Sequence, residues 1–382
     1  MKYRRFGKLD WEVSVLGFGI MRMPIIDDNP ANIDKPEAIR MIHYTIDQGV
    51  NYLDTAYMYH SEQSEPLVAE ALKDGYREKV RIATKMPISK VEAPEDFDRL
   101  FNEQLARLQD NKVDFYLLHG LDAEGWAKAR DFGVIKWAED KIARGSIGQL
   151  GFSFHDEYKV FKEIIDAYDN WTFCQVQYNF MDNDYQAGRA GVEYAAEKGL
   201  AIVVMEPLRG GMLAKEPPPA VSAVWKNASK AYSQVDLALQ WIWNQPEISI
   251  ILSGMSTMEQ IEQNCSSADR SGPGTLATED LLLVDRIREA YQGLIPIPCT
   301  GCGYCIPCPN GVEIPKIFEI FNDSTMYEDM ERGRKLYQGD MDLKEEQQAD
   351  KCIECGECME VCPQTIDIIS KLKEAHSILK PE

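Results

Sequence analysis

The chain has no long apolar run and few basic residues for its length. No stretch of its 382 residues approaches the length that spans a bilayer, and its first residues, MKYRRFGKLDW, contain no apolar segment that would direct export. Its 41 Lys and Arg residues stand against 62 Asp and Glu residues, a formal net charge of −21. Because such a balance repels phosphates, it argues against nucleic acid as a partner. We therefore expect a cytoplasmic protein that binds neither nucleic acid nor membranes.

A second absence concerns glycine-rich turns. The chain has no G-x-G-x-x-G pattern, which argues against an open doubly wound sheet. From about residue 12 to residue 268, short apolar runs instead alternate with amphipathic ones, a pattern that predicts parallel strands joined by helices. Eight such units favour a closed (β/α)8 TIM barrel. The predicted strands are Val15–Gly19, Asn51–Thr55, Arg81–Thr84, Asp114–Leu118, Gly148–Ser153, Phe173–Gln177, Ala201–Met205 and Ile248–Leu252.

Local patterns predict the first helices and one end of this barrel. Residues 37–48 and 95–109 repeat apolar side chains at helical spacing, and Asp34 with Glu37 has the spacing of a capping box. Residues 2–14 have the pattern of a short hairpin with a Gly-Lys turn. We expect this hairpin to close the end of the barrel at which the strands begin.

Eight of the ten cysteines form two groups near the C-terminus. Each group runs C-x2-C-x2-C, continues to a fourth cysteine and is followed by a proline; the members are Cys299, Cys302, Cys305 and Cys308, and Cys352, Cys355, Cys358 and Cys362. This spacing turns successive thiolates toward one point, and two such sets indicate two [4Fe-4S] clusters. Zinc and disulfides are the alternatives, but zinc usually takes two C-x2-C pairs, and cysteines this crowded cannot all pair without strain.

The cysteine pattern resembles that of the two-cluster bacterial ferredoxins, in which the fourth cysteine of each group binds the other cluster. The resemblance implies one cluster on Cys299, Cys302, Cys305 and Cys362, and a second on Cys352, Cys355, Cys358 and Cys308. The spacer between the groups contains helix-like runs such as residues 314–321. We therefore expect a smaller, mainly helical ferredoxin-like domain at residues 291–382, after a barrel at residues 1–290.

Four polar residues fall where predicted strands end. Asp54 and Tyr59 follow the second strand, Lys85 ends the third and His119 ends the fourth. The carboxyl ends of the strands meet at one face of a β/α barrel, and reacting groups lie at that face. Each residue alone also has a structural explanation, but four such residues at successive strand ends indicate a catalytic site.

These residue types are suited to proton transfer. We expect the charge of Lys85 to lower the pKa of Tyr59, and the neighbouring aspartate to keep the lysine charged. Tyr59 would then serve as a general acid near neutral pH, while His119 orients a carbonyl oxygen. Two further histidines, His60 and His155, border this set. For both we favour a structural role over contact with a substrate.

The first 290 or so residues resemble the aldo-keto reductases. The matching stretches are residues 51–59, 80–86, 113–119, 146–155, 175–179, 207–208 and 253–264. The resemblance implies that Asp54, Tyr59, Lys85 and His119 form the catalytic tetrad, and that Tyr59 protonates a small-molecule carbonyl substrate while hydride leaves NAD(P)H. The tail resembles that of a subgroup with a fused two-cluster 4Fe-4S domain.

The resemblance also implies a set of cofactor-binding residues. Ser153 and Gln175 would hold the nicotinamide carboxamide, and Met205 would lie against the ring where the family commonly has an aromatic residue. Gly210 and Gly211 would let backbone N–H groups approach the pyrophosphate. The full set is Gly19, Met21, Arg22, Ser153, Gln175, Met205, Pro207, Leu208, Gly210, Gly211, Gly254, Ser256, Gln260 and Asn264.

Some positions depart from the family pattern. Phe154 stands where an asparagine usually assists the serine before it. Gly254 and Gln260 stand where many NADPH-preferring members have a lysine and an arginine. Because a 2′-phosphate binds weakly without cationic partners, we lean slightly toward NADH, although Arg22 or Arg209 would also supply positive charge.

The two predicted domains leave three interpretations open. The first is an NAD(P)-dependent carbonyl reductase whose clusters tune or sense redox state. The second is an enzyme that passes electrons between nicotinamide or substrate and a ferredoxin-like or other redox partner protein. The third is a regulatory module in which the clusters only stabilise the tail, and the intact tetrad argues against it. Hydride carries two electrons and a cluster one, so coupling them normally requires a flavin; the sequence has no pattern that marks a flavin site.

Overall fold

The computed structural model describes residues 1–226, 228, 230, 232–339 and 343–381, and the chain divides into two compact units. The first comprises Met1–Ala214 and Tyr232–Glu279, and the second comprises Lys215–Ala231 and Asp280–Glu382. The predicted boundary at residue 290 lies near the end of helix α11 (Thr278–Gln292), whereas this division falls near its start. Among the described residues, none of the helices is both long and apolar enough to cross a membrane.

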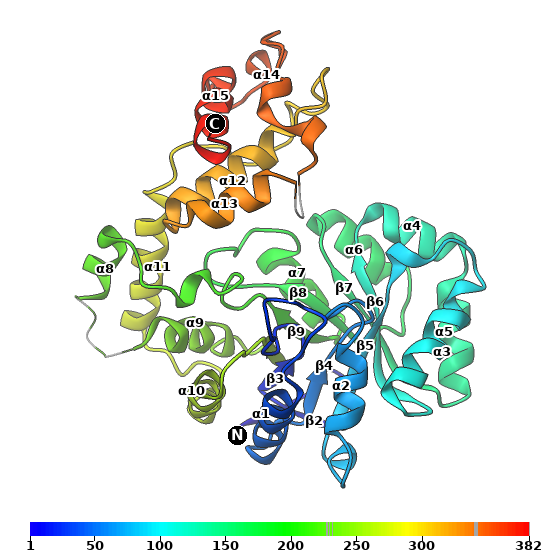
Figure 1. Ribbon diagram of the computed structural model, residues 1–382. Coiled ribbons are helices and arrows are strands. Elements are labelled where there is room, and N and C mark those ends of the chain that lie inside the picture. The colour runs from blue at the N-terminus through cyan, green and yellow to red at the C-terminus, as the bar shows by residue number, and fades with distance from the viewer. Residues whose placement is uncertain (227, 229, 231, 340–342, 382) are drawn as a thin grey trace. The chain divides into compact units, whose positions relative to one another are not determined.

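The first unit is built around a closed barrel of eight parallel strands (Figure 1). Each strand overlaps one of the predicted runs, so the (β/α)8 fold is confirmed. Side chains fill the interior and helices cover the outside, which is why the strands are almost continuously apolar. The strands are β3 (Leu16–Gly19), β4 (Tyr52–Asp54), β5 (Arg81–Met86), β6 (Val113–Leu121), β7 (Ile147–Phe154), β8 (Phe173–Gln177), β9 (Ala201–Met205) and β10 (Ile250–Ser253).

The predicted hairpin closes the end of the barrel at which the strands begin. Strand β1 (Tyr3–Arg5) pairs antiparallel with β2 (Glu12–Ser14). Between them, the buried ring of Phe6 lies 4.8 Å from the ring of Phe115 and 5.5 Å from that of Phe173. These aromatic side chains fill the interior at this end, so the opposite end is where a ligand can enter.

The helices of this unit bury one apolar side against the barrel. Helix α1 (Lys35–Asp47) begins after the predicted cap Asp34, whose Oδ1 accepts a hydrogen bond from the backbone N of Glu37 at 3.3 Å. The capping box is not completed, because the backbone N of Asp34 donates to the carbonyl oxygen of Pro24 and the Glu37 carboxylate pairs with Arg40. The other helices and 3-10 turns are α2 (Ser64–Ala71), η1 (Arg77–Lys79), η2 (Ile88–Lys90), α3 (Asp96–Leu108), α4 (Ala123–Asp131), α5 (Val134–Ala143), α6 (Tyr158–Asp166), α7 (Gly188–Glu197), η3 (Met212–Ala214), α9 (Gln234–Trp243) and α10 (Met258–Asp269).

The second unit is mainly helical, as predicted, and has an apolar core of its own. Helix α12 (Ile314–Met326), which contains the helix-like run in the spacer, packs against α13 (Met330–Tyr337) and α15 (Ile368–Leu379). Cysteine side chains from both groups border this core. The smaller elements are α8 (Pro219–Trp225), η4 (Glu345–Gln347), η5 (Ala349–Lys351) and α14 (Glu357–Glu360).

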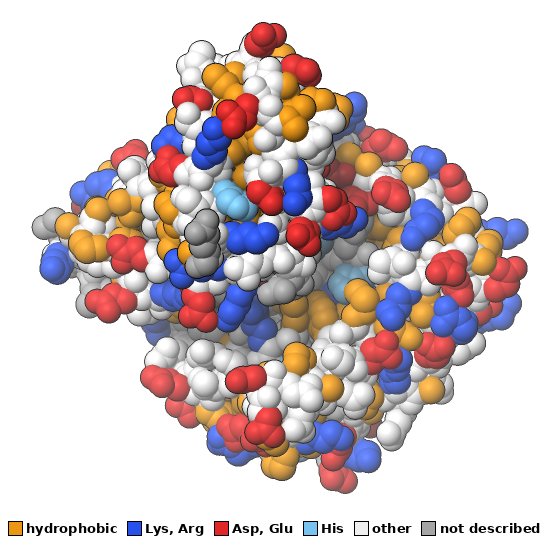
Figure 2. Space-filling model, turned by 45° about the horizontal axis from the view of Figure 1, so that its top comes forward, with side chains coloured by type: hydrophobic (Ala, Val, Ile, Leu, Met, Phe, Trp, Pro, Cys, Tyr) orange, Lys and Arg blue, Asp and Glu red, His pale blue; other side chains and the backbone are white. Residues whose placement is uncertain are grey.

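The acidic excess is not gathered on the face that Figure 2 shows. Acidic and basic side chains are mixed over that face, and no extended area of one sign is visible among the side chains drawn there. Many charged residues pair locally; for example, Arg77 lies 2.7 Å from Asp110 and 2.9 Å from Asp114. Pairs of this kind near the surface contribute little to stability individually.

Candidate active site and cysteine groups

A buried ion pair lies at the carboxyl ends of β4 and β5. Nζ of Lys85 is 2.6 Å from Oδ1 of Asp54 and 2.8 Å from the carbonyl oxygen of Thr55. The side chain of Lys85 is 0% exposed and that of Asp54 4%. Burial is the largest influence and works to lower the pKa of Lys85, but the charges of Asp54 and Tyr59 and the hydrogen bonds to both together outweigh it, so the net direction is upward. The ammonium group therefore stays charged in a site that excludes water.

The hydroxyl of Tyr59 lies 3.4 Å from Nζ of Lys85. Burial raises the pKa of Tyr59, and the positive charge of Lys85 only partly opposes this, because the carboxylate of Asp54 acts in the same direction as burial. The expectation of a lowered pKa is therefore wrong: desolvation of the phenolate exceeds the attraction of the lysine. Tyr59 is a protonated phenol at neutral pH, which suits a group that gives a proton.

His119, near the end of β6, places its ring edge-on to Tyr59 with the ring centroids 5.9 Å apart. Burial lowers the pKa of His119 to about 3, and the nearby charges of Lys85 and His155 act in the same direction. The imidazole is therefore neutral at physiological pH. Its Nδ1 atom is buried and makes no hydrogen bond within the part of the chain that the structure describes. A neutral ring of this kind can bind a substrate oxygen but does not serve as a cationic acid.

These groups border a cavity of about 440 Å³. Asp54, Tyr59 and His119 line it, whereas Lys85 lies behind them. Every predicted cofactor-binding residue also lines it except Asn264, whose buried amide Nδ2 donates to Oγ of Ser253 at 3.2 Å. The residues that line it outside the predicted set are His155, Glu206, Leu252 and Ser253.

Two polar side chains of the cavity wall come from neighbouring strands. The hydroxyl oxygen of Ser153, in β7, accepts a hydrogen bond from the backbone N of Gly120 at 2.7 Å. Gln175, in β8, directs Nε2 toward Sδ of Met205 at 3.7 Å. Its Oε1 atom is buried and accepts no hydrogen bond from any residue that the structure describes. An amide N–H group of a ligand would satisfy this oxygen.

The loop after β9 brings a carboxylate into the cavity that we did not predict. Glu206 has a left-handed backbone conformation, with φ of 54°, and its side chain accepts a hydrogen bond from the backbone N of Gly210. Its Oε1 atom lies 3.7 Å from Nη2 of Arg22. The sequence contained one indication that Glu206 belongs to the site. It is an acidic residue directly after a predicted strand, and it precedes the Pro207-Leu208 pair that we did assign to the cofactor site.

The far end of the cavity is formed by the start of α10 and the loop before it. Oε1 of Gln260 accepts hydrogen bonds from the backbone N of Ser256 at 2.8 Å and from its hydroxyl at 3.3 Å. Gly254 lies against Arg22, because a Cβ atom at Gly254 would come within 3.2 Å of Cδ of that arginine. Arg22 is therefore the cation at the end of the cavity where Gly254 and Gln260 replace the family's basic residues.

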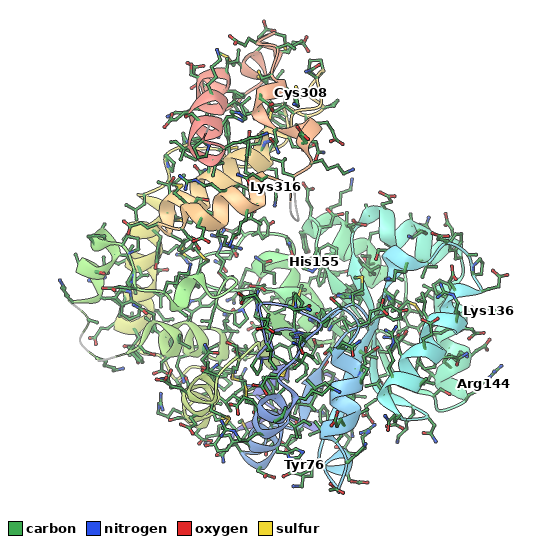
Figure 3. All side chains as sticks on the ribbon, viewed as in Figure 1. Tyr76, Lys136, Arg144, His155, Cys308 and Lys316 are labelled. Carbon is green, nitrogen blue, oxygen red and sulfur yellow. The ribbon has the colours of Figure 1, made fainter. Side chains whose placement is uncertain are left out.

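The two histidines that border the predicted site have different environments. His60 is held away from the cavity, since its Nε2 accepts a hydrogen bond from the backbone N of Met23 at 3.1 Å and its Nδ1 lies 2.9 Å from the carbonyl oxygen of Pro30. His155, which is labelled in Figure 3, is by contrast one of the residues that line the cavity. Sequence position alone did not separate the two, because each follows an active-site strand.

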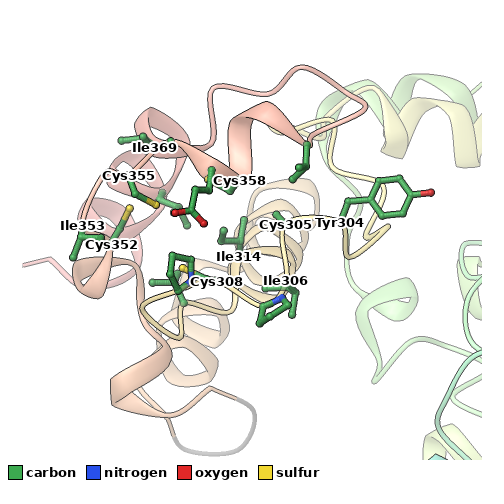
Figure 4. Close-up of a pocket in the computed structure, with 17 residues that line it drawn as sticks. Tyr304, Cys305, Ile306, Cys308, Ile314, Cys352, Ile353, Cys355, Cys358 and Ile369 are labelled. Atoms are coloured by element: carbon green, nitrogen blue, oxygen red, sulfur yellow. The ribbon is translucent and has the colours of Figure 1, made fainter.

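In the second unit, the cysteines line two cavities. One is bordered by Cys299, Cys302, Cys305 and Cys362. The other is bordered by Cys308, Cys352, Cys355 and Cys358, with Cys305 also at its wall (Figure 4). Apart from Cys305, which borders both cavities, each cavity is lined by the cysteines of one of the sets that the resemblance to two-cluster ferredoxins implies.

The thiols of each cavity influence one another. Burial raises the pKa of Cys299, and the neighbouring Cys302 and Cys362 raise it further. Burial also raises the pKa of Cys358, followed by the effects of Cys352, Cys355 and Cys308. Because iron binds the thiolate form, an iron cluster would have to displace these protons, and its positive charge is suited to do so.

Comparison with known proteins identifies both units. Residues 15–272 match the Aldo/keto reductase family, and residues 298–366 match the 4Fe-4S dicluster domain. The chain is 24% identical over 298 residues to the oxidoreductase YqkF of Bacillus subtilis. This alignment covers 70% of this chain and 92% of YqkF. It is 26% identical over 325 residues to L-galactose dehydrogenase of Arabidopsis thaliana, covering 77% of this chain and 96% of that protein.

Solved structures show the same fold. The holo form of the aldo-keto reductase AKR11C1 from Bacillus halodurans aligns with a TM-score of 0.63 and 25% identity, covering 75% of this chain and 96% of that one. An aldo-keto reductase from Klebsiella pneumoniae, solved in complex with NADPH, aligns with a TM-score of 0.59 and 21% identity, covering 75% of this chain and 95% of that one.

Proposed function

The chain belongs to the aldo/keto reductase family and carries a C-terminal 4Fe-4S dicluster domain, and from this premise we propose that it is an NAD(P)H-dependent reductase of small carbonyl compounds. The observation that carries the proposal is the position of Lys85, which contacts both Asp54 and Tyr59 at the wall of the cavity. A protonated phenol beside a buried cation is a suitable proton donor to an oxygen that gains negative charge.

The residues of the cavity fit a nicotinamide cofactor. The buried Oε1 of Gln175 needs a donor, and a carboxamide N–H group supplies one. Gly211 has a φ of 89°, and a Cβ atom there would meet no other atom within 4 Å, so a phosphate group has room to approach its backbone. The backbone N of Gly210 donates to Glu206, so that carboxylate would have to move for a phosphate to bind there. When bound there, NAD(P)H would supply the hydride that the reaction needs.

Within this site, each member of the tetrad has a distinct task. Tyr59 holds the proton that the carbonyl oxygen receives. Lys85 stabilises the phenolate that remains, and Asp54 keeps the lysine charged and in place. His119, a neutral imidazole, orients the carbonyl oxygen through a hydrogen bond.

The test of this function is a steady-state assay of NADH and NADPH oxidation with a panel of aldehydes and ketones. Turnover should depend on the carbonyl compound and should produce the corresponding alcohol. If the protein binds NAD(P)H and reduces none of the panel, carbonyl reduction is the wrong assignment.

The dicluster domain favours a second candidate function, the transfer of single electrons to or from a ferredoxin-like partner protein. One cysteine beside each cavity, Cys302 in the first and Cys355 in the second, is exposed, so the cluster sites are close to the surface of their unit. We propose that each cavity holds one [4Fe-4S] cluster, which would supply one-electron chemistry.

The two candidates give different results in one anaerobic experiment. NADH, and then NADPH, is added to the cluster-loaded protein while the visible absorbance of the clusters is recorded. Bleaching would mean that nicotinamide and clusters exchange electrons, and would support the second candidate. Unchanged absorbance with NAD(P)H bound would leave the carbonyl reductase, with clusters that serve structure or sensing.

A further inference from the structure

A second cavity, of about 380 Å³, adjoins the first at the carboxyl ends of the strands. His119 and His155 line both cavities, so the two meet at this pair of imidazoles. The second cavity is lined by polar side chains as well as apolar ones, including Ser89, Asp122 and Lys128. Its volume lies within the range of small-molecule sites. A substrate whose carbonyl group lies at His119 would therefore extend past His155 into a polar space.

His155 is placed at this junction by the end of β7. Its backbone N donates to the carbonyl oxygen of Leu121 at 2.9 Å, which ties it to the end of β6. Its side chain is exposed and lines both cavities, and neither ring nitrogen forms a hydrogen bond with any residue that the structure describes. A neutral imidazole offers one donor and one acceptor, so this ring is equipped to bind a hydroxyl group.

Charged groups surround His155 on both sides. The carboxylate of Glu206 faces it from the first cavity and that of Asp122 from the second, and the ring also lies close enough to His119 to influence its pKa. Gly120 borders the second cavity next to the ring: it has a φ of 62°, and a Cβ atom there would lie 3.9 Å from Cδ2 of His155. The second cavity thus offers hydrogen-bonding groups and a glycine next to the ring, together with the apolar side chains of Met58, Pro87 and Ile88.

We propose that His155 selects carbonyl compounds that carry a hydroxyl group on the carbon next to the carbonyl. This inference rests on the proposed function, since it places the carbonyl oxygen at Tyr59 and His119. The adjacent hydroxyl then lies at His155, and the remaining polar part of the substrate extends toward Ser89 and Lys128. Hydroxy aldehydes, hydroxy ketones and open-chain sugars belong to this class.

The overall reaction balances without a further reagent. The carbonyl carbon gains the hydride of NAD(P)H, which is oxidised to NAD(P)+, and the C=O double bond becomes a single bond. The oxygen takes the proton of Tyr59, which is replaced from solvent. A hydroxy carbonyl compound is reduced to a vicinal diol, and the hydroxyl at His155 is unchanged.

The geometry favours this class over purely apolar aldehydes. A substrate with a hydroxyl exchanges its hydrogen bonds to water for bonds to His155, whereas an apolar chain would remove water from the imidazole without replacing it. A site that binds a hydroxyl group in this way rejects the analogue that lacks it, because its polar groups are left unpaired.

The test compares glyceraldehyde with propanal, which have the same number of carbons and differ in their hydroxyl groups. We would measure kcat/KM for both with the holoenzyme and with His155→Phe, His155→Ala and His155→Gln. The ratio of the two constants cancels effects common to both aldehydes. We expect His155→Phe and His155→Ala to lower the glyceraldehyde-to-propanal ratio by about three- to tenfold, the worth of a neutral hydrogen bond. His155→Gln, which keeps a donor and an acceptor, should hold the ratio within about twofold.

His43→Gln is the matched control. Its ring lies outside both cavities, with Nε2 2.7 Å from the carbonyl oxygen of Ala71, and its substitution should leave the ratio unchanged. An unchanged ratio in the His155 variants, or an equal loss for both aldehydes, overturns the inference and leaves the reductase in place. If the unmodified protein binds NAD(P)H and reduces no carbonyl compound at all, the proposed function fails and the inference fails with it.

Discussion

Nζ of Lys85 and Oδ1 of Asp54 are 2.6 Å apart inside the barrel, and neither side chain is more than 4% exposed. Strands β4 and β5 are neighbours in the closed sheet, so their carboxyl ends bring the two residues together. The lysine also reaches the hydroxyl of Tyr59 at 3.4 Å. The ammonium group of Lys85 therefore forms both the buried ion pair with Asp54 and the contact with the proposed proton donor Tyr59. Substitutions can separate its effect on stability from its effect on catalysis.

Lys85→Met should lower the free energy of unfolding by about 3–5 kcal/mol near neutral pH, because it leaves Asp54 buried without its partner. Urea denaturation would measure this change. The pKa of Lys85 is raised above 10.5 in the folded protein, so its contribution is complete below that pH and is lost as pH rises through the folded pKa. The difference between the two proteins should therefore narrow in strong alkali, and a constant difference would contradict this account.

The double variant Lys85→Met, Asp54→Leu should recover part of that stability, since no unpaired charge remains buried. Carbonyl reduction should stay low, because Tyr59 has lost the cation that opposes its raised pKa. Urea denaturation and the reductase assay, run side by side, separate the two effects. Recovery of activity together with stability would mean that the lysine has only a structural role.

Tyr59→Phe should reduce kcat for carbonyl compounds by about 10²–10⁴-fold, the usual contribution of a general acid, while NAD(P)H still binds. Fluorescence titration with NAD(P)H measures the second property. Tyr57→Phe is a matched control, because Tyr57 is nearby but donates its hydroxyl to Glu103 at 2.6 Å and does not line the cavity. Equal losses in the two variants would point to a general structural effect.

His119 should remain neutral across the physiological range. The pKa of His119 is about 3 in the folded protein, below the ordinary value of 6.5. The contribution of the buried neutral ring to the free energy of unfolding is therefore complete above pH 6.5 and is lost as pH falls toward 3, because only the unfolded chain takes up the proton in that range. NMR of the ring carbons should show no titration of His119 near neutral pH, and His119→Asn should make the loss of stability in acid less steep. A ring that titrates near 6.5 would show that the imidazole is hydrated.

Pairs of cysteine substitutions can test which cysteines share a cluster. If Cys302 and Cys362 bind the same cluster, the double variant Cys302→Ser, Cys362→Ser should keep about half of the iron, whereas Cys355→Ser, Cys362→Ser should lose nearly all of it. Iron content per chain after anaerobic reconstitution gives the answer. The reverse result would assign Cys362 to the cluster of its own group. Cys174→Ala is the control, since Cys174 is buried in the barrel.

Arg22 should decide how well the protein tolerates the 2′-phosphate of NADPH. It lies beside Gly254, and the family's other basic position is occupied by Gln260. Arg22→Ala should weaken NADPH binding by about tenfold or more and NADH binding much less, because a charge-assisted hydrogen bond to phosphate is lost. Gln260→Arg should shift the preference in the opposite direction. Equal effects on both nucleotides would place Arg22 at the pyrophosphate instead.

The sequence by itself determined the barrel, its closing hairpin and the helical character of the second unit. These features follow from local regularities of the sequence, in which short apolar runs alternate with segments of helical periodicity. Each apolar run that was predicted to be a strand overlaps a strand of the structure. The positions of Asp54, Tyr59, Lys85 and His119 at strand ends were equally visible, because a parallel barrel brings those ends to one face.

Only the tertiary structure decided the electrostatics and the neighbours of the site. The pKa of Tyr59 is raised, against expectation, because desolvation depends on everything packed around the ring. Glu206 and His155 line the cavity because loops distant in sequence meet there, and His60 does not because its ring nitrogens are held by backbone groups. The resemblance to two-cluster ferredoxins implied which cysteines would share a cavity, but the spacing within each group does not, since residues far apart in sequence become neighbours only when the core between them forms.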